Sequence, residues 1–392
     1  MTAPLITSHV GVLASLCGVC AFYFLIEQVT RWKLFRYLPP LVFIYLTPVI
    51  LSNTGVLPTS SETYDVIKSM VLPMMLVLLL LKVDVVAAIR VMGKGVFVMF
   101  IGTAGIVIGA PISYWLVKDR LGPEGWKAFG TLAGSWIGGT GNMAGVSEMI
   151  GTDGTEFGLA VLADTLIYLI WLPIMLGSKN LAHWFARFAK VDADRLSKMD
   201  EAAKSVAKQE IAPDLRHYLY LACIGLSVTW IANVVSSWLP EVKPYIDAGT
   251  WRILLVTTAG IGLSFTPAKN IPGSHAFAMA LVYLFVARMG AMAELQGVAD
   301  QAMPFLLAAL FWIFLHGAFC MLGAWIFRVD IHTAAIASAA NVGGAASAPI
   351  VAAHHKESLV PASILMALLG YAVGNYAAYL AAILCSLVHR FL

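Results

Sequence analysis

A glycine-rich stretch with polar side chains, GSWIGGTGNMAG, lies within an apolar run long enough to cross a membrane. Glycine inside a helix costs about 1 kcal/mol relative to alanine, so this run is a poor continuous helix. Non-helical backbone at membrane depth is tolerated only where protein or water satisfies its polar groups. We therefore expect the stretch to face a polar site. The candidate residues are Ser135, Gly138, Gly139, Thr140 and Asn142.

A second stretch of this kind, VGGAAS, lies in the second half of the chain. Each stretch belongs to the fifth apolar run of its half, and a long sixth run follows each. The ends of half-helices there would favour a carboxylate at one side and a hard cation such as Na⁺ at the other. Ordinary hydrogen bonding between packed helices is the alternative role for each side chain. The candidate residues are Ser338, Asn341, Gly343, Gly344 and Ser347.

Asp164 is an acid inside the apolar run LAVLADTLIYLIWLPIML. A charged side chain at the centre of a membrane helix costs about 2.5–3.5 kcal/mol on insertion scales, which makes it a functional candidate. We expect Asp164 to carry a proton or to bind Na⁺, with Thr140 as a second possible Na⁺ ligand. A structural hydrogen bond to a neighbouring helix is the alternative. Asn375 lies in the comparable run of the second half and could supply a neutral partner.

Two further charged residues lie late in apolar runs. Arg288 is expected either to bind an anionic substrate or to pair with Glu294, and snorkelling to the interface is the alternative. Glu148 lies near the end of its run, which favours an interfacial position. The sequence contains no HExxH zinc motif, P-loop or visible nucleophile–base pair. It therefore predicts neither an enzyme nor an ATP-driven pump, and no cofactor beyond a possible bound Na⁺.

Membrane helices must position these residues. The chain has 392 residues, of which 60% are hydrophobic and 12% charged, against roughly 25% charged in soluble domains. Six apolar runs, a polar linker and six more runs follow one another. This pattern predicts an all-α polytopic membrane protein with repeats at residues 9–178 and 216–389 and a linker at 179–215. No basic run or RNA-binding signature suggests nucleic acid as a partner.

The distribution of Lys and Arg distinguishes two topologies. If every run crosses the lipid bilayer, the early basic loops and the basic linker lie on opposite sides. If the two glycine-rich runs are re-entrant hairpins, each half crosses five times and both basic groups are cytoplasmic, as the positive-inside rule prefers. The N-terminus is then outside, and the second half is inverted relative to the first. Broken helices that cross fully, or glycine-mediated packing without a ligand, are the alternatives.

GSWIGGTGNMAG, the following ADTLIYLIWLP and the later SAANVGGAASAPIVAAHH resemble the YjcL-like family of uncharacterised bacterial and plastid membrane proteins, over nearly the whole chain. That family is grouped with the cation:proton antiporter/anion transporter superfamily. Its relatives include glutamate:sodium symporters, 2-hydroxycarboxylate transporters and bile acid:sodium symporter-like proteins. The first two groups carry GGxG motifs at re-entrant tips where substrate and sodium bind. Residues 138–141 match that motif, and residues 343–346 depart from it at the final Gly.

The resemblance implies an elevator-type carrier, usually a homodimer. With the residues above, it leads us to expect an ion-coupled secondary transporter of the bacterial inner membrane. The cargo would be a small organic anion that moves with Na⁺ or H⁺ by alternating access. The alternative is a monovalent cation:proton antiporter. Antiporters of the superfamily place one or two acids in the helix after the first broken helix, where this chain has Asp164 preceded by Ala163.

Overall fold

The chain folds into a bundle of helices. The computed structural model describes residues 4–192, 194–195, 199, 201–202, 211–243, 245–294 and 298–391, so part of the predicted linker lies outside the described residues. Within these ranges, eight helices are long and apolar enough to cross a membrane. Two shorter helices, α3 (Pro40–Asn53) and α14 (Ala248–Ser264), coincide with two further apolar runs. The prediction of an all-α polytopic membrane protein is confirmed.

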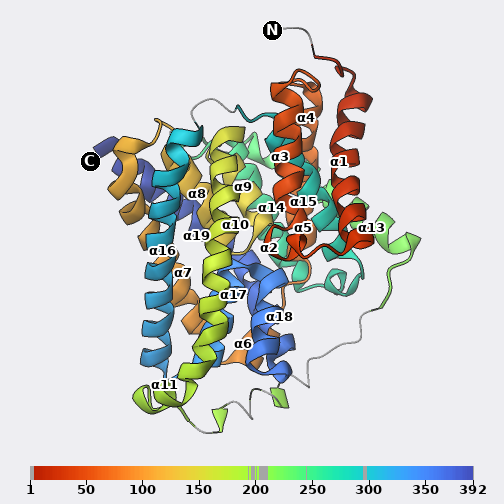
Figure 1. Ribbon diagram of the computed structural model, residues 1–392. Coiled ribbons are helices and arrows are strands. Elements are labelled where there is room, and N and C mark those ends of the chain that lie inside the picture. Colours follow the sequence, from red (N-terminus) through yellow and green to blue (C-terminus); the bar gives the residue numbers. More distant parts are fainter. Residues whose placement is uncertain are drawn as a thin grey trace.

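The two halves contain similar elements in the same order (Figure 1). The first has α1 (His9–Thr30), α3, α4 (Glu62–Val66), the π-helical turn η1 (Ile67–Val71), α5 (Leu72–Leu80), α7 (Gly95–Val117), α8 (Gly125–Trp136), α9 (Thr140–Met149) and α10 (Gly154–Gly177). The second has α13 (Leu215–Ser236), α14, α15 (Ser274–Ala291), α16 (Val298–Phe327), α17 (Ile331–Val342), α18 (Gly344–His355) and α19 (Val360–Phe391). Short helices such as α2 (Leu34–Tyr37), α6 (Val85–Met92) and α11 (Ala182–Phe188) lie between the longer ones.

Polar caps fix where several of the long helices begin. An N-cap side chain satisfies backbone N–H groups that have no partner inside the helix. Such a cap places a polar residue at the helix end and leaves the apolar residues for the span. The side chains that accept a first-turn N–H are those of Ser8, Asp153, Asp214, Asp247 and Asp330.

The first glycine-rich stretch forms a helical hairpin of α8 and α9. The hydroxyl oxygens of Thr131 and Thr152 lie 2.9 Å apart at the open end of the hairpin. At the other end the chain reverses at Gly138 and Gly139, whose φ angles are +131° and +82°. Glycine adopts this region without the steric penalty that a Cβ would bring. The second arm therefore returns to the end of the bundle from which the first arm starts.

The second glycine-rich stretch forms a hairpin of α17 and α18. At its open end, Nδ1 of His332 lies 2.9 Å from Nδ1 of His355. The chain reverses at Gly343 and Gly344, and Gly344 has a φ of +57°. In this structure both stretches are thus hairpins, not broken helices that run on across the bundle.

The hairpins approach one another from opposite ends of the bundle (Figure 1). The pair α8 and α9 lies in the upper part of the view, and the pair α17 and α18 lies in the lower part. A Cβ built on Gly344 would lie 3.8 Å from Cα of Gly139, so the two tips meet. The corresponding helices α7 and α16 also run antiparallel, because Gly102 faces Cys320 whereas Gly109 faces Trp312.

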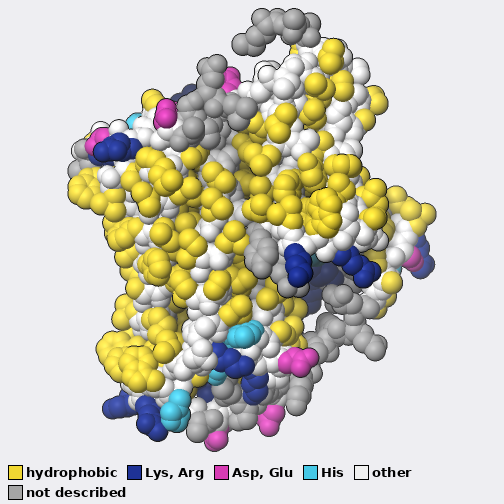
Figure 2. All heavy atoms as spheres, viewed as in Figure 1, with side chains coloured by type: hydrophobic (Ala, Val, Ile, Leu, Met, Phe, Trp, Pro, Cys, Tyr) yellow, Lys and Arg dark blue, Asp and Glu magenta, His cyan; other side chains and the backbone are white. Residues whose placement is uncertain are grey.

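The basic loop after α6 and the linker lie on the same face of the molecule. Arg90, Lys94, Lys190, Arg195 and Arg328 line one cavity of about 500 Å³. Arg195 of the linker donates to the carbonyl of Met92 (3.3 Å) and pairs with Asp330 (3.2 Å). Figure 2 shows Lys and Arg gathered below a broad apolar band, with a further group above it.

Candidate functional site

The two hairpin tips meet against α19. A Cβ on Gly138 would lie 2.6 Å from the carbonyl oxygen of Gly370, closer than real side chains approach. Cβ atoms on Gly139 and Gly344 would lie 3.4 Å from Cε1 and 3.6 Å from the hydroxyl of Tyr371, respectively. Backbone therefore approaches backbone at this point, and Tyr371 lies beside both tips.

Asn142 ties the first tip to α19. Its Nδ2 lies 3.3 Å from the carbonyl of Ile137, 3.4 Å from that of Gly370 and 3.1 Å from that of Tyr371. The side chain is buried. In this structure the amide nitrogen of Asn142 therefore holds the tip in place, and it is not available to a ligand.

Asp164 of α10 binds the first hairpin. Oγ of Ser135 donates to Oδ2 at 2.9 Å, and Nε1 of Trp136 donates to Oδ1 at 3.1 Å. Asp164 is half-buried, and among the described residues it forms no ion pair. Two neutral donors leave the carboxylate charge uncompensated, and a bound cation or proton would stabilise it. Two of the candidate residues, Asp164 and Ser135, are thus in direct contact. No hydrogen bond joins Asp164 to Thr140 in this part of the structure.

One helical turn beyond Asp164, Tyr168 of α10 lies against the second hairpin. A Cβ on Gly343 would lie 3.1 Å from Cε2 of Tyr168. Thr140 begins α9 and Ser347 lies in the first turn of α18, and both are half-buried. The N-termini of α9 and α18 thus lie at the two tips, where their partial positive charges favour an anion.

Two polar residues of α17 serve helix packing. The amide of Asn341 is fully buried, donates to the carbonyl of Met99 (3.0 Å) and accepts from Oγ1 of Thr103 (3.1 Å). Ser338 accepts from Nε1 of Trp171 at 2.9 Å. Because both ends of the Asn341 amide are engaged with α7, this residue joins two helices in this structure.

The other two candidates lie apart from Asp164. Asn375 donates to Oγ1 of Thr257 at 2.8 Å and so joins α19 to α14. Arg288 is only 4% exposed, which excludes snorkelling in this structure. Its Nε donates to the carbonyl of Tyr64 at 2.8 Å, not to Glu294.

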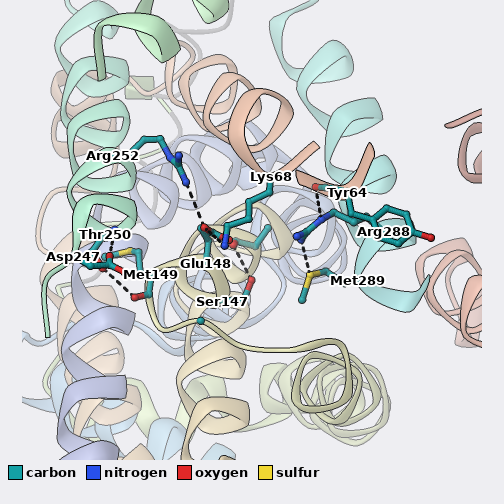
Figure 3. Close-up of polar contacts among 12 residues, drawn as sticks. Tyr64, Lys68, Ser147, Glu148, Met149, Asp247, Thr250, Arg252, Arg288 and Met289 are labelled. Atoms are coloured by element: carbon teal, nitrogen blue, oxygen red, sulfur yellow. Dashed lines mark hydrogen bonds and ion pairs between the residues drawn. The ribbon is translucent and has the colours of Figure 1, made fainter. Parts of the chain in front are cut away.

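A cluster of three charged residues, Glu148, Lys68 and Arg252, lies at the open end of the first hairpin (Figure 3). Glu148 lies in the last turn of α9, and its side chain is 8% exposed. Its Oε1 lies 2.9 Å from Nζ of Lys68 and 3.4 Å from Nη2 of Arg252. The carboxylate of Glu148 is thus buried between two cations, and its position relative to the membrane interface stays a prediction. We call these three residues the Glu148 cluster.

The partners of Glu148 come from two other helices. Lys68 lies in η1, which directly precedes α5. Pro73, the second residue of α5, cannot donate a hydrogen bond to the carbonyl four residues earlier. Such π-helical turns often occur at functional sites. Arg252 lies in α14, whose Thr250 donates to the carbonyl of Met149 at 3.0 Å. The cluster therefore connects the first hairpin to α5 and α14.

Sequence reasoning missed Trp136, Lys68 and Arg252. Trp136 stands next to Ser135 in GSWIGG, and a hydrogen-bond donor beside a predicted ion ligand was a usable signal. Lys68 and Arg252 lie near the starts of apolar runs, where a basic residue ordinarily indicates the interface. Only the folded chain brings them to Glu148.

Comparison with known proteins gives two matches. Residues 14–388 match the family described as "Protein of unknown function (DUF819)". The chain is also 27% identical over 340 residues to the "Uncharacterized membrane protein YjcL" of Bacillus subtilis (strain 168), across 84% of this chain and 85% of that protein. The resemblance to the YjcL-like family is thereby confirmed.

Proposed function

We propose that this chain, which belongs to the family described as "Protein of unknown function (DUF819)", is an ion-coupled secondary transporter of a small organic anion. The observation that carries this proposal is the meeting of two hairpin tips from opposite ends of the bundle beside Asp164. Transporters built from inverted repeats bind substrate and coupling ion at the point where the repeats meet, through the ends of interrupted helices.

The coupling ion, Na⁺ or H⁺, is proposed to bind at Asp164. Ser135 and the backbone at Gly138 and Gly139 would supply neutral oxygen ligands, and Thr140 a hydroxyl. The 2.9 Å contact of Ser135 with Asp164 supports this assignment, because a hydroxyl that donates to a carboxylate can also offer its lone pairs to a cation.

The anion is proposed to bind at the tips, where the N-termini of α9 and α18 converge. Thr140 and Ser347 lie in the first turns of these helices and are half-buried. Asn142, Asn341 and Arg288 are engaged with backbone or side chains in this structure, so a contribution from them would require rearrangement. The backbone N–H groups at the tips are therefore the first candidates for the anion.

Alternating access would move the hairpins with α7, α10, α16 and α19 against the remaining helices. Packing supports this division, since α7 packs on α16, whereas α3 packs on α15 and α14 on α5. The family resemblance implies an elevator-type motion and a homodimer. The runner-up, a monovalent cation:proton antiporter, would use the same acid without an organic substrate.

The chain is proposed to lie in the bacterial inner membrane with the linker in the cytoplasm and the N-terminus outside. The basic residues shared by the early loops and the linker support this orientation. A cysteine introduced at the exposed Ala212 should stay unlabelled by an impermeant maleimide in intact cells and react after lysis. Labelling in intact cells would reverse the orientation.

Ion binding should appear as a gain in stability of the purified protein. Thermal unfolding is compared in NaCl and in choline chloride of equal ionic strength, from pH 5.5 to 8.5. A ligand at 100 times its Kd stabilises the folded state by about 2.7 kcal/mol. We expect a rise in Tm that is specific for Na⁺, or a dependence on pH alone if the proton is the coupling ion. A Tm that responds to neither would contradict the proposal, and an ion response that no carboxylate increases would favour the antiporter.

A further inference from the structure

Positive charge exceeds negative charge in the Glu148 cluster. One buried carboxylate lies between the ammonium of Lys68 and the guanidinium of Arg252. Arg288 of α15 also interacts electrostatically with Glu148, and with Asp65 as a second acid. The side chain of Arg252 is 16% exposed and that of Lys68 is 41% exposed, so the costly burial falls on the guanidinium, which shares its one carboxylate with Lys68.

Arg252 has unused hydrogen-bonding capacity. Its Nε is buried and has no hydrogen-bond partner among the described residues. Its other contacts are long: 3.4 Å from Nη1 to Oδ1 of Asn233 and 3.4 Å from Nη2 to Glu148. A guanidinium ordinarily binds a carboxylate or phosphate through two short parallel bonds. Arg252 therefore holds Glu148 through one long contact and has donor capacity left over for an anion that replaces this carboxylate.

A cavity of about 960 Å³ adjoins the cluster. Besides Lys68 and Arg252, the basic residues Lys127 and Arg390 line it. Two further acids line the same wall: Glu124 pairs with Lys127, so these two charges offset one another, and Asp247 accepts the N–H of Thr250. Pockets for small molecules range from about 300 to 1,000 Å³. The cavity lies by the open end of the first hairpin, on the face away from α11 and the linker.

We propose that Lys68 and Arg252 form a capture site for an oxyanion, either a carboxylate or a phosphate, and that the Glu148 carboxylate occupies this site in the present conformation. This inference rests on the proposed function, in which an organic anion is the cargo. An arriving anion replaces Glu148 on the two cations. Glu148 is then released from α5 and α14, and the first hairpin loses this connection to both helices.

The test is anion-dependent stability of the purified full-length chain. Succinate and inorganic phosphate are titrated separately at pH 7, with potassium chloride added to hold ionic strength constant, and Tm is followed by tryptophan fluorescence. Glu148→Gln keeps the shape of the side chain but removes the resident charge. The half-saturating anion concentration should fall at least tenfold relative to the unsubstituted chain. The more effective anion of the two identifies the source as a carboxylate or a phosphate.

Matched variants distinguish anion binding at Lys68 and Arg252 from a general effect of salt on Tm. Glu124→Gln removes the same charge from the wall of the same cavity without touching Lys68 or Arg252, and it should behave like the unsubstituted chain. Adding Arg252→Gln to Glu148→Gln should abolish the response. If Glu148→Gln unfolds, Glu148→Asp shortens the carboxylate and should give an intermediate shift. Equal responses of Glu148→Gln and Glu124→Gln would overturn the proposal.

The experiments distinguish a failure of the capture site from a failure of the proposed ion-coupled transport. Arg252→Gln should leave any Na⁺-specific rise in Tm intact, because Arg252 contacts Asn233 and Glu148 and not the Asp164 end of α8. An anion response without any effect of Na⁺ or pH would keep the capture site and reject ion coupling.

Discussion

Replacing Asp164 with Asn should remove the dependence of stability on the coupling ion. The amide has nearly the same shape and can still accept one hydrogen bond, from Ser135 or Trp136. It carries no charge, however, and a cation at this site loses its only anionic ligand among the described contacts. We expect the Na⁺-specific rise in Tm to disappear, which corresponds to at least a tenfold loss of apparent Na⁺ affinity. The Na⁺-specific rise in Tm is measured by thermal unfolding in NaCl and in choline chloride.

A control with the same chemical change is available at Asp119. That side chain is 87% exposed and pairs with Lys118 in the turn after α7, away from the hairpin tips. Asp119→Asn should keep the full ion response. If Asp164→Asn also keeps it, Asp164 has a structural role and the coupling ion binds elsewhere.

Gly138→Ala should strongly destabilise the folded chain. Alanine at a φ of +131° is strained by about 1–3 kcal/mol, and its Cβ would meet the carbonyl of Gly370 at 2.6 Å. Overpacking of this kind typically costs a further 1–3 kcal/mol or so. Because the clash involves backbone on both sides, rotation of a side chain cannot relieve it. We expect a loss of at least about 2 kcal/mol in the free energy of unfolding, measured as a fall in Tm and in resistance to denaturant.

The comparison variant is Gly262→Ala. Gly262 lies on the exposed side of α14, and an added Cβ would meet nothing within 4 Å. There alanine should be neutral or stabilising by up to about 1 kcal/mol, because glycine is the weaker helix former. Equal stabilities of the two variants would show that the tip is open and that the two glycines are not required for close packing.

Much of the fold could be predicted from the sequence because the relevant forces are local or simple. Apolar runs long enough to span lipid indicated the helices, and glycine pairs without charge indicated the turns at Gly139 and Gly344. The placement of Lys and Arg distinguished hairpins from crossing helices, and the observed hairpins agree with that choice. A hydropathy profile alone would have counted the hairpins as crossings.

The candidate site was predicted less completely, because side-chain partners depend on contacts distant in the chain. Asp164 and Ser135 were separate candidates in the sequence, and the structure brings them into contact. Asn341 has an amide that could bind a ligand, but both of its polar atoms form hydrogen bonds within the protein. Their partners, Thr103 and Met99, lie more than 230 residues away in the sequence. No local pattern distinguishes a free amide from an engaged one. Glu148 was not a candidate in the sequence, and it gains its importance only in the fold. Its cations Lys68 and Arg252 come from two other helices.

The central claim is that an ion bound at Asp164 drives the movement of an organic anion. The most direct measurement is the transient current of proteoliposomes on a solid-supported membrane, under a Na⁺ or pH gradient and with a panel of mono-, di- and tricarboxylates. We predict a current for the unsubstituted chain that requires both the ion gradient and one class of carboxylate, and no current for Asp164→Asn. Equal currents from the two proteins, or an ion current that no carboxylate changes, would contradict the claim.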